Sequence, residues 1–212
     1  MKCYTCDAEA TTREHVPPRS FFPKVHRQNL LTVPSCYAHN HDQSLDIEYV
    51  RNLISGFYGT NAEAERTFQI AKRSFNRSAA LFHQTFGDFE RILLNGEETG
   101  TFRVDLDRVK SVMKPIASAL YLMDYGKRYA AEWNVFVTSL RSREDLAGLP
   151  SQAQRFRDLL SSIQFVARPA PHPDIFTYAN SEIPGGIVFE LVFYGSFTTH
   201  CFGPTADRLQ TV

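Results

Sequence analysis

Three short segments in the first fifth of the chain decide the fold: Cys3-Tyr4-Thr5-Cys6, then Glu14-His15-Val16-Pro17-Pro18, then Cys36-Tyr37-Ala38-His39-Asn40. Two pairs of candidate metal ligands, each with two residues between its members, bracket an acidic residue followed by a histidine. A single Cys-x-x-Cys pair also occurs by chance and in redox loops. A Cys-x-x-Cys pair and a Cys-x-x-His pair on either side of Glu-His, with an asparagine directly after the last ligand, form a much more specific signal.

The two pairs supply the donors of a zinc site. Cys3, Cys6, Cys36 and His39 offer three thiolates and one imidazole, a tetrahedral set that Zn²⁺ favours. Because all four positions are protein ligands, the predicted zinc is structural and closed to substrate. His41 is an alternative fourth ligand, although the spacing of His39 matches the first pair better. Burial of the cysteines without any metal is the other alternative.

Zinc ligation would also arrange a second group of residues. It would fix the loop after Cys6 to a helix start at Asn40, and so bring Glu14 and His15 beside Asn40. A carboxylate and an amide oxygen are hard ligands, which suit Mg²⁺ or a similar ion that keeps several waters and takes a phosphate oxygen. His15 would point to the other side of an extended strand, where it can accept a proton from water.

This order of residues resembles the HNH endonuclease family, the ββα-metal nucleases of the zinc-ribbon subclass, over about residues 3–54. The resemblance implies that His15 is the general base and that Glu14 and Asn40 hold a catalytic Mg²⁺ or Mn²⁺. It implies that Asn29 is the central asparagine that fixes the loop carrying the histidine. It further implies hydrolysis of DNA phosphodiester bonds to 5′-phosphate and 3′-hydroxyl ends.

The chain departs from the family pattern in three places. The second pair ends in His39 rather than the commoner cysteine, and the last family position is Asn40 rather than histidine. The basic residue that often follows the second pair is missing, because the chain reads His-Asp-Gln over 41–43. Asn29 also has an ordinary interpretation as a turn residue, and Glu14 and His15 as an exposed ion pair.

The chain behind this segment predicts a mixed body. The prolines predict an extended segment over 16–18, and apolar spacing and turn residues predict strands over 30–33, 133–140, 187–194 and 196–202, the last two as a hairpin. Helices are predicted over 40–53, 61–83, 107–125 and 151–162, so the N-terminal order is strand, loop, strand and helix. Pro115 predicts a kink or restart in the third helix. The predicted fold class is therefore α+β. An N-terminal zinc-bound ββα-metal (HNH) module over 1–55 precedes a body of mixed helices and antiparallel strands over 60–212, which selects substrate or partner.

Bulk properties limit how the protein meets a polyanion. The 212 residues carry a formal net charge of zero, so no global basic field attracts nucleic acid. Affinity must come from a bound metal ion or a local patch, for which Arg13, Arg19 and Lys24 are the candidate substrate-binding residues. Exposed surface charge is the alternative for each of them. The N-terminus lacks the apolar run of a signal peptide and no apolar stretch is long enough to span a membrane, so a reducing cytoplasm is expected.

The leading hypothesis is a metal-dependent HNH endonuclease that acts on DNA, with RNA left open as substrate. A homodimer is a candidate arrangement, and restriction or anti-phage defence is the biological role that such stand-alone proteins suggest. The alternative is a zinc-ribbon module that binds nucleic acid or protein without catalysis. A redox protein using Cys3 and Cys6 is a third interpretation, which Cys36 and His39 at matching spacing argue against. Cys201 is expected as a small buried residue in a strand.

Overall fold

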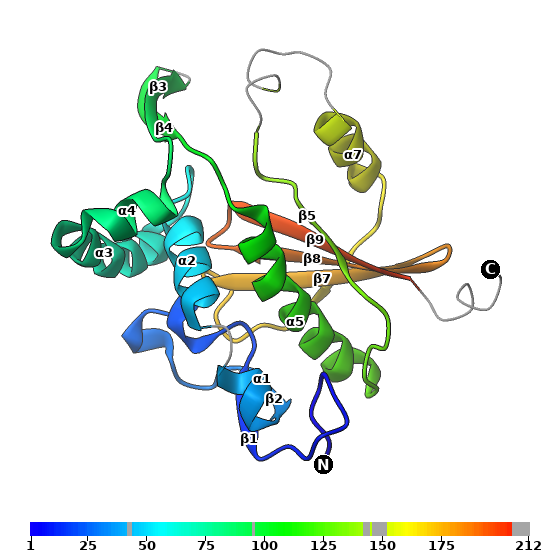
Figure 1. The fold of residues 1–212 in the computed structure, drawn as a ribbon. Coiled ribbons are helices and arrows are strands. Elements are labelled where there is room, and N and C mark those ends of the chain that lie inside the picture. The colour runs from blue at the N-terminus through cyan, green and yellow to red at the C-terminus, as the bar shows by residue number, and fades with distance from the viewer. Residues whose placement is uncertain (42–43, 95, 142–144, 146–151, 205–212) are drawn as a thin grey trace.

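The computed structural model describes residues 1–212 except 42–43, 95, 142–144, 146–151 and 205–212. Helices and antiparallel sheets are mixed along the chain, so the predicted α+β class is confirmed (Figure 1). Among the described residues, no helix has both the length and the apolar character that crossing a bilayer requires.

The N-terminal segment has the predicted order of strand, loop, strand and helix. Its elements are β1 (Thr12–His15), the 3-10 turns η1 (Arg19–Phe21) and η2 (Lys24–His26), β2 (Thr32–Ser35), α1 (Tyr37–His41) and α2 (Ser44–Ser55). β1 pairs antiparallel with β2, with Glu14 opposite Val33 and His15 opposite Thr32. The extended segment predicted over 16–18 lies just after β1 and outside the ladder, because the two prolines have no N–H to continue it.

The predicted helix over 61–83 is two helices, α3 (Ala62–Arg77) and α4 (Ala79–Thr85). Ser78 lies between them in an extended conformation, and its hydroxyl accepts a hydrogen bond from the Leu81 amide at 3.3 Å. Serine at such a position competes for backbone groups and starts a new helix. By contrast α5 (Leu106–Tyr125) continues through Pro115 without a restart and ends at Gly126 in the left-handed conformation.

The body contains a five-stranded antiparallel sheet in the order β5-β9-β8-β7-β6. The predicted hairpin is present as β8 and β9, and the predicted strand near Trp133 is the shorter β5. Strands β6 and β7 and the separate hairpin of β3 and β4 were not predicted. The bounds are β3 (Glu90–Leu94), β4 (Glu97–Thr101), β5 (Asn134–Val137), α7 (Gln152–Ser161), β6 (Val166–Arg168), β7 (Phe176–Ile183), β8 (Gly186–Phe193) and β9 (Phe197–Pro204).

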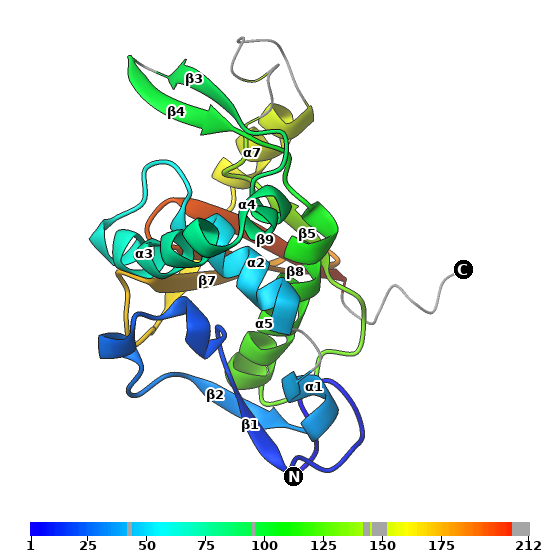
Figure 2. The same ribbon diagram turned by 60° about the vertical axis from the view of Figure 1, so that its left-hand side comes forward.

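The arrangement in space separates two ends of the molecule. In both views the β1–β2 sheet lies at one end and the β3–β4 hairpin projects at the other, with α5 crossing one face of the five-stranded sheet (Figures 1 and 2). α3 and α4 lie beside α2. The start of the predicted helix over 151–162 falls on residue 151, which is outside the described residues.

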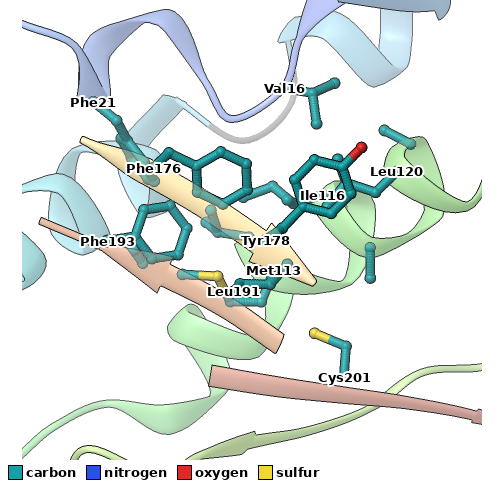
Figure 3. Close-up of a cluster of buried hydrophobic side chains, with 14 of the residues drawn as sticks. Val16, Phe21, Met113, Ile116, Leu120, Phe176, Tyr178, Leu191, Phe193 and Cys201 are labelled. Carbon is teal, nitrogen blue, oxygen red and sulfur yellow. The ribbon is translucent and has the colours of Figure 1, made fainter. Parts of the chain in front are cut away.

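One hydrophobic core joins the N-terminal segment to the body. Met113, Ile116 and Leu120 of α5 face the inner side of the sheet, and Val16 and Phe21 of the N-terminal segment enter the same cluster (Figure 3). The rings of Phe21 and Phe193 of β8 meet edge to face, with centroids 5.8 Å apart. The division at residues 55–60 stays a prediction, since apolar packing is continuous across it.

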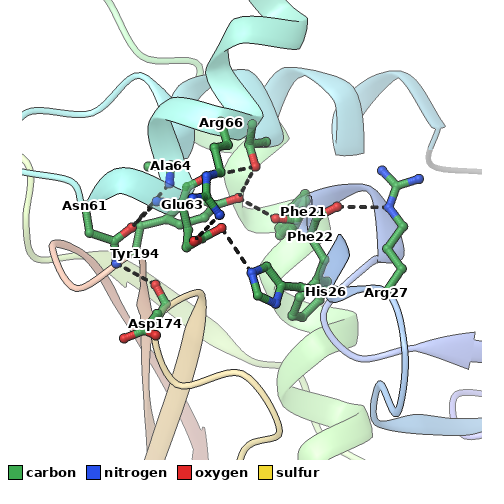
Figure 4. A network of polar contacts seen from close by, with 11 residues as sticks. Phe21, Phe22, His26, Arg27, Asn61, Glu63, Ala64, Arg66, Asp174 and Tyr194 are labelled. Carbon is green, nitrogen blue, oxygen red and sulfur yellow. Dashed lines mark hydrogen bonds and ion pairs between the residues drawn. The ribbon is translucent and has the colours of Figure 1, made fainter. Parts of the chain in front are cut away.

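A polar network also links the N-terminal segment to the body (Figure 4). Tyr194 is almost completely buried, and its hydroxyl donates to the Phe21 carbonyl and lies 3.1 Å from Thr67 Oγ1. His26 Nε2 lies 3.2 Å from Glu63 Oε2 of α3. The loop that connects β1 to β2 is thus held by contacts to α3 and to the residue that follows β8.

We expect Tyr194→Phe to lower the free energy of unfolding by about 1–3 kcal/mol, because the substitution leaves the buried Phe21 carbonyl without its donor. Urea unfolding followed by circular dichroism measures the change. Tyr121→Phe is the matched control, since the Tyr121 hydroxyl has no hydrogen-bond partner among the described residues and its removal should leave stability unchanged. Equal unfolding curves for Tyr194→Phe and the parent would contradict the assigned role of this bond.

Candidate functional site

The four predicted zinc ligands lie together. Cys3 and Cys6 come from the N-terminal loop, which the Cys3 amide closes by donating to the Ala8 carbonyl at 2.9 Å. Cys36 directly precedes α1, and His39 lies on that helix. Since β1 pairs with β2 and α1 follows β2 directly, the strand pairing carries the second pair of ligands to the first.

Distances within this Cys–His cluster fit a tetrahedral ion. His39 Nδ1 lies 3.1, 3.5 and 3.7 Å from the sulfurs of Cys36, Cys6 and Cys3, and the Cys6 and Cys36 sulfurs are 3.9 Å apart. All four donor atoms lie within 4.8 Å of one another. Zinc bonds of about 2.3 Å to sulfur and about 2.0 Å to nitrogen imply tetrahedral edges of about 3.8 Å between sulfurs and about 3.5 Å between sulfur and nitrogen. The donor set can hold a metal ion such as zinc.

The surroundings of the sulfurs differ between Cys3 and Cys6. Burial raises the pKa of the Cys3 thiol, but hydrogen bonds from the Thr5 hydroxyl and from the Thr5, Cys36 and Cys6 amides outweigh it and lower the pKa to about 5. A hydrogen bond from the Ala8 amide lowers the pKa of Cys6, but burial and the neighbouring sulfurs of Cys3 and Cys36 together outweigh it and raise the pKa. Three sulfurs this close cannot all ionise easily without a cation between them. The side chain of His41, the alternative ligand, is outside what the structure describes.

Glu14, His15 and Asn40 line one small pocket beside the Cys–His cluster, and His39 and Tyr4 line it as well. Glu14 and His15 are the last two residues of β1, and Asn40 is on α1. The pocket holds about 30 Å³, which is room for about two water-sized groups. The structure therefore brings together the three residues that the sequence assigns to the catalytic ion and the general base.

The electrostatics of this pocket favour a cation and a neutral imidazole. Burial, followed by the negative charges of Glu14, Cys3 and Cys36, raises the pKa of Tyr4. The negative charges of the Cys–His cluster and of Glu14 therefore both act on Tyr4, at the wall of the pocket that this residue forms. Burial lowers the pKa of His15, and the positive charge of Arg19 lowers it further. A neutral imidazole at neutral pH has a nitrogen lone pair that can accept a proton.

The far wall of the pocket comes from α5, and sequence reasoning did not foresee it. Val112, Pro115, Ile116 and Ala119 line the pocket from a helix more than seventy residues away in the chain. The apolar spacing of the helix predicts that this face is buried, but not what it packs against. The wall excludes solvent from one side of Glu14 and His15.

Comparison with protein-family models, with curated proteins and with solved structures finds no match to this chain. The resemblance to HNH endonucleases therefore rests on the residues of the first 54 positions and on their arrangement. Neither the family nor an activity follows from any relative.

Asn29 does not join the pocket. It lies exposed in the loop before β2 and has a φ of 56°, a left-handed conformation that asparagine tolerates better than most residues. The residue is absent from the pocket lining among the described residues. This geometry supports the interpretation of Asn29 as a turn residue, and its family role stays a prediction.

The three predicted substrate-binding residues differ in position. Arg13 is exposed and lies along the strand pair, its Nε donating to Thr32 Oγ1 at 2.8 Å. Arg19 follows Pro18, which lines the pocket, and lies close enough for its charge to act on His15. Lys24 is exposed in η2. Of the three, Arg19 is the one with a structural link to the candidate site.

Two further arginines lie near Arg19: Arg27, which the sequence also suggests as a phosphate contact, and Arg51, which it does not. Burial lowers the pKa of Arg27, and the positive charges of Arg19 and Arg51 add to the effect. Arg27 Nε donates to the Phe22 carbonyl at 2.9 Å, and Arg51 contacts Glu48 on its own helix at 3.1 Å. Gathered guanidinium groups are suited to bind phosphate oxygens. Arg51 comes from α2, so only the fold brings it to this cluster.

Proposed function

We propose that this protein is a metal-dependent endonuclease of the HNH type that hydrolyses DNA phosphodiester bonds. The observation that carries the proposal is the pocket lined jointly by Glu14, His15 and Asn40 beside the Cys–His cluster. A structural metal site alone has no need of a glutamate, a histidine and an asparagine that converge on one pocket. That convergence is what a hydrolytic site with a second, hydrated ion requires.

Each residue has a defined task in this proposal. Glu14 and Asn40 would hold a divalent ion through their side-chain oxygens, while His15 accepts the proton of the attacking water. The ion, when bound, would supply positive charge to the phosphate and to the departing 3′ oxygen. Arg19, whose charge acts on His15, would contact a phosphate next to the one that is cleaved. The apolar wall from α5 lowers the local dielectric, which strengthens the attraction between Glu14 and the ion.

The second candidate function is a zinc-ribbon binding module without catalysis. The observation that favours it is the small size of the pocket and its cover by Val112, Pro115 and Ile116 of α5. Space of about 30 Å³ does not admit a phosphate group, so substrate would have to meet Glu14 and His15 at the pocket mouth. A binding module would keep its zinc and its affinity for DNA but show no cleavage with any divalent ion.

Nicking of supercoiled plasmid separates the two functions. We expect the parent to nick DNA with Mg²⁺ or Mn²⁺ and to lose activity in EDTA. Glu14→Gln should require a higher Mn²⁺ concentration for the same rate, because an amide oxygen binds a divalent ion more weakly than a carboxylate does. Glu9→Gln, an exposed change in the same segment, is the matched control and should behave as the parent.

Two results would overturn the proposal: no cleavage by the parent with any divalent ion, or equal Mn²⁺ dependence of Glu14→Gln and the parent. An RNA substrate in parallel shows which nucleic acid is cut. The ratio of nicked to linear plasmid shows whether two copies of the chain act together on the two strands.

A further inference from the structure

A second, larger cleft lies on the opposite face of the five-stranded sheet. Glu190 of β8 and Thr198 and His200 of β9 alternate with the core residues of their strands, so their side chains point away from α5. They line a cleft of about 540 Å³, a size that suits a small-molecule ligand. The same cleft is also lined by Tyr58, Thr138, Ser139, Arg141, Arg157, Phe165 and Ser196.

The floor of this cleft carries three polar side chains, those of Glu190, His200 and Thr138. Glu190 and His200 are directly opposite each other in the β8–β9 register, and His200 Nε2 lies 3.2 Å from Glu190 Oε2. His200 Nδ1 lies 3.0 Å from Thr138 Oγ1, and the Phe165 ring packs against the imidazole with centroids 5.6 Å apart. His200 is only 4% exposed, whereas the Glu190 side chain is 33% exposed. The trio therefore fixes a carboxylate that opens into the cleft.

Glu190 has capacity left for a ligand. Among the described residues its hydrogen bond goes through Oε2 to His200, so Oε1 is available as an acceptor. An ionised carboxylate accepts and does not donate, so the complementary ligand group is an N–H or O–H donor. Ser196 also lines the cleft with a buried hydroxyl oxygen that lacks a partner in the described structure. A polar surface prepared in this way is typical of a site for a specific ligand.

The trio is not arranged for nucleophilic catalysis by Thr138. The amides of Thr138 and Ser139 both donate to the Thr198 carbonyl, at 3.0 and 3.3 Å. These are the backbone donors nearest the hydroxyl in sequence, and they are already used. A developing oxyanion would need such donors to be free. Recognition is therefore the role that the trio supports.

The rest of the cleft offers an aromatic wall and positive charge. Tyr58 and Phe165 provide aromatic surface, and Arg141 and Arg157 provide two guanidinium groups. Arg157 is ion-paired with Asp145 at 3.0 Å and also donates to Gln154 and to the Leu140 carbonyl, so most of its N–H donors are used and Arg141 is the main cation for a ligand. Aromatic surface suits a planar base, and guanidinium groups suit a phosphate. The ligand that matches the whole set has a planar base with donors and a phosphate.

We propose that this cleft binds a guanine nucleotide, with the base N–H donors on Glu190 and the phosphate on Arg141. Guanine presents two adjacent donors, its ring N1–H and its 2-amino group, to a carboxylate. Adenine presents an acceptor at N1 beside its amino group, which a carboxylate repels. The same chemistry can come from a free nucleotide or from a guanine residue within a single-stranded nucleic acid.

Isothermal titration of the full chain tests this site with GMP, AMP, inorganic phosphate and a single-stranded oligonucleotide with one guanine. We expect GMP to bind at least about tenfold more tightly than AMP, which equals about 1.4 kcal/mol. Glu190→Gln should remove the preference for GMP over AMP. Glu98→Gln, an exposed change in β4, is the matched control and should leave both affinities unchanged.

Arg141→Ala keeps the test decisive if Glu190→Gln does not fold, because Arg141 is exposed at the rim. This variant should weaken GMP binding and leave the preference for guanine over adenine intact. Tighter binding of the oligonucleotide than of GMP would show that the ligand is a guanine residue within a single-stranded nucleic acid rather than a free nucleotide. Absence of binding by both GMP and the oligonucleotide, or equal affinities for GMP and AMP, would overturn the proposal. Nuclease activity does not enter the measurement, so the two proposals fail independently.

Discussion

His15→Ala is expected to lower the rate of plasmid nicking by about 10²–10⁴-fold, the usual contribution of a positioned general base. The imidazole lines the pocket together with Glu14 and Asn40, and burial followed by the charge of Arg19 lowers its pKa, so the base is in the neutral form. Alanine removes the proton acceptor and leaves the strand intact, because His15 is the last residue of β1. The measurement is the single-turnover cleavage rate at saturating Mn²⁺.

The controls for His15→Ala separate chemistry from folding. His83 is exposed on α4 and does not line the pocket, so His83→Ala should cleave at the parent rate. His15→Ala should also keep the parent zinc content, thermal midpoint and affinity for DNA. Equal nicking by His15→Ala and the parent would show that the imidazole has no part in the reaction. A thermal midpoint of His15→Ala well below that of the parent would instead show that His15 acts by stabilising the fold.

Local spacing was enough to predict the elements whose apolar residues have a regular period. The helix over 107–125 is present as α5, since apolar residues at helical spacing pack against the sheet. β7 was missed because polar residues interrupt its apolar pattern. One of them, Asn180, is buried and donates to Asp124 Oδ2 at 2.7 Å, so a tertiary contact decides its place. The break at Ser78 was missed because one serine within a periodic run gives little warning.

The candidate site likewise has features that local sequence predicts and features that it does not. The sequence located the Cys–His cluster, because ligand spacing is a local property and the four donors do converge. It also named Glu14, His15 and Asn40, which strand pairing and the following helix bring to one pocket. The wall from α5, the arrival of Arg51 from α2 and the cleft around His200 all depend on packing between distant elements. No pattern within a single segment encodes such contacts.

Cys36→Ala is expected to abolish zinc binding and to unfold the N-terminal segment. Elemental analysis should give one zinc per chain for the parent and none for the variant. Zinc binding contributes about 10–16 kcal/mol in small zinc-held domains, more than the usual stability margin of a globular protein. Because Cys3, Val16 and Phe21 belong to the same core as the body, loss of the ion should lower the thermal midpoint of the whole chain.

Cys201→Ala is the matched cysteine control for this experiment. Cys201 is fully buried in β9, where burial raises the pKa of its thiol and keeps it protonated, and it lies outside the Cys–His cluster. Its loss should leave the zinc content unchanged and lower stability by about 1 kcal/mol, the usual cost of a small cavity. If Cys36→Ala kept its zinc, or had the same thermal midpoint as Cys201→Ala, the four donors would not be the structural metal site. The pocket of Glu14, His15 and Asn40 would then owe its shape to strand pairing and to α5 alone.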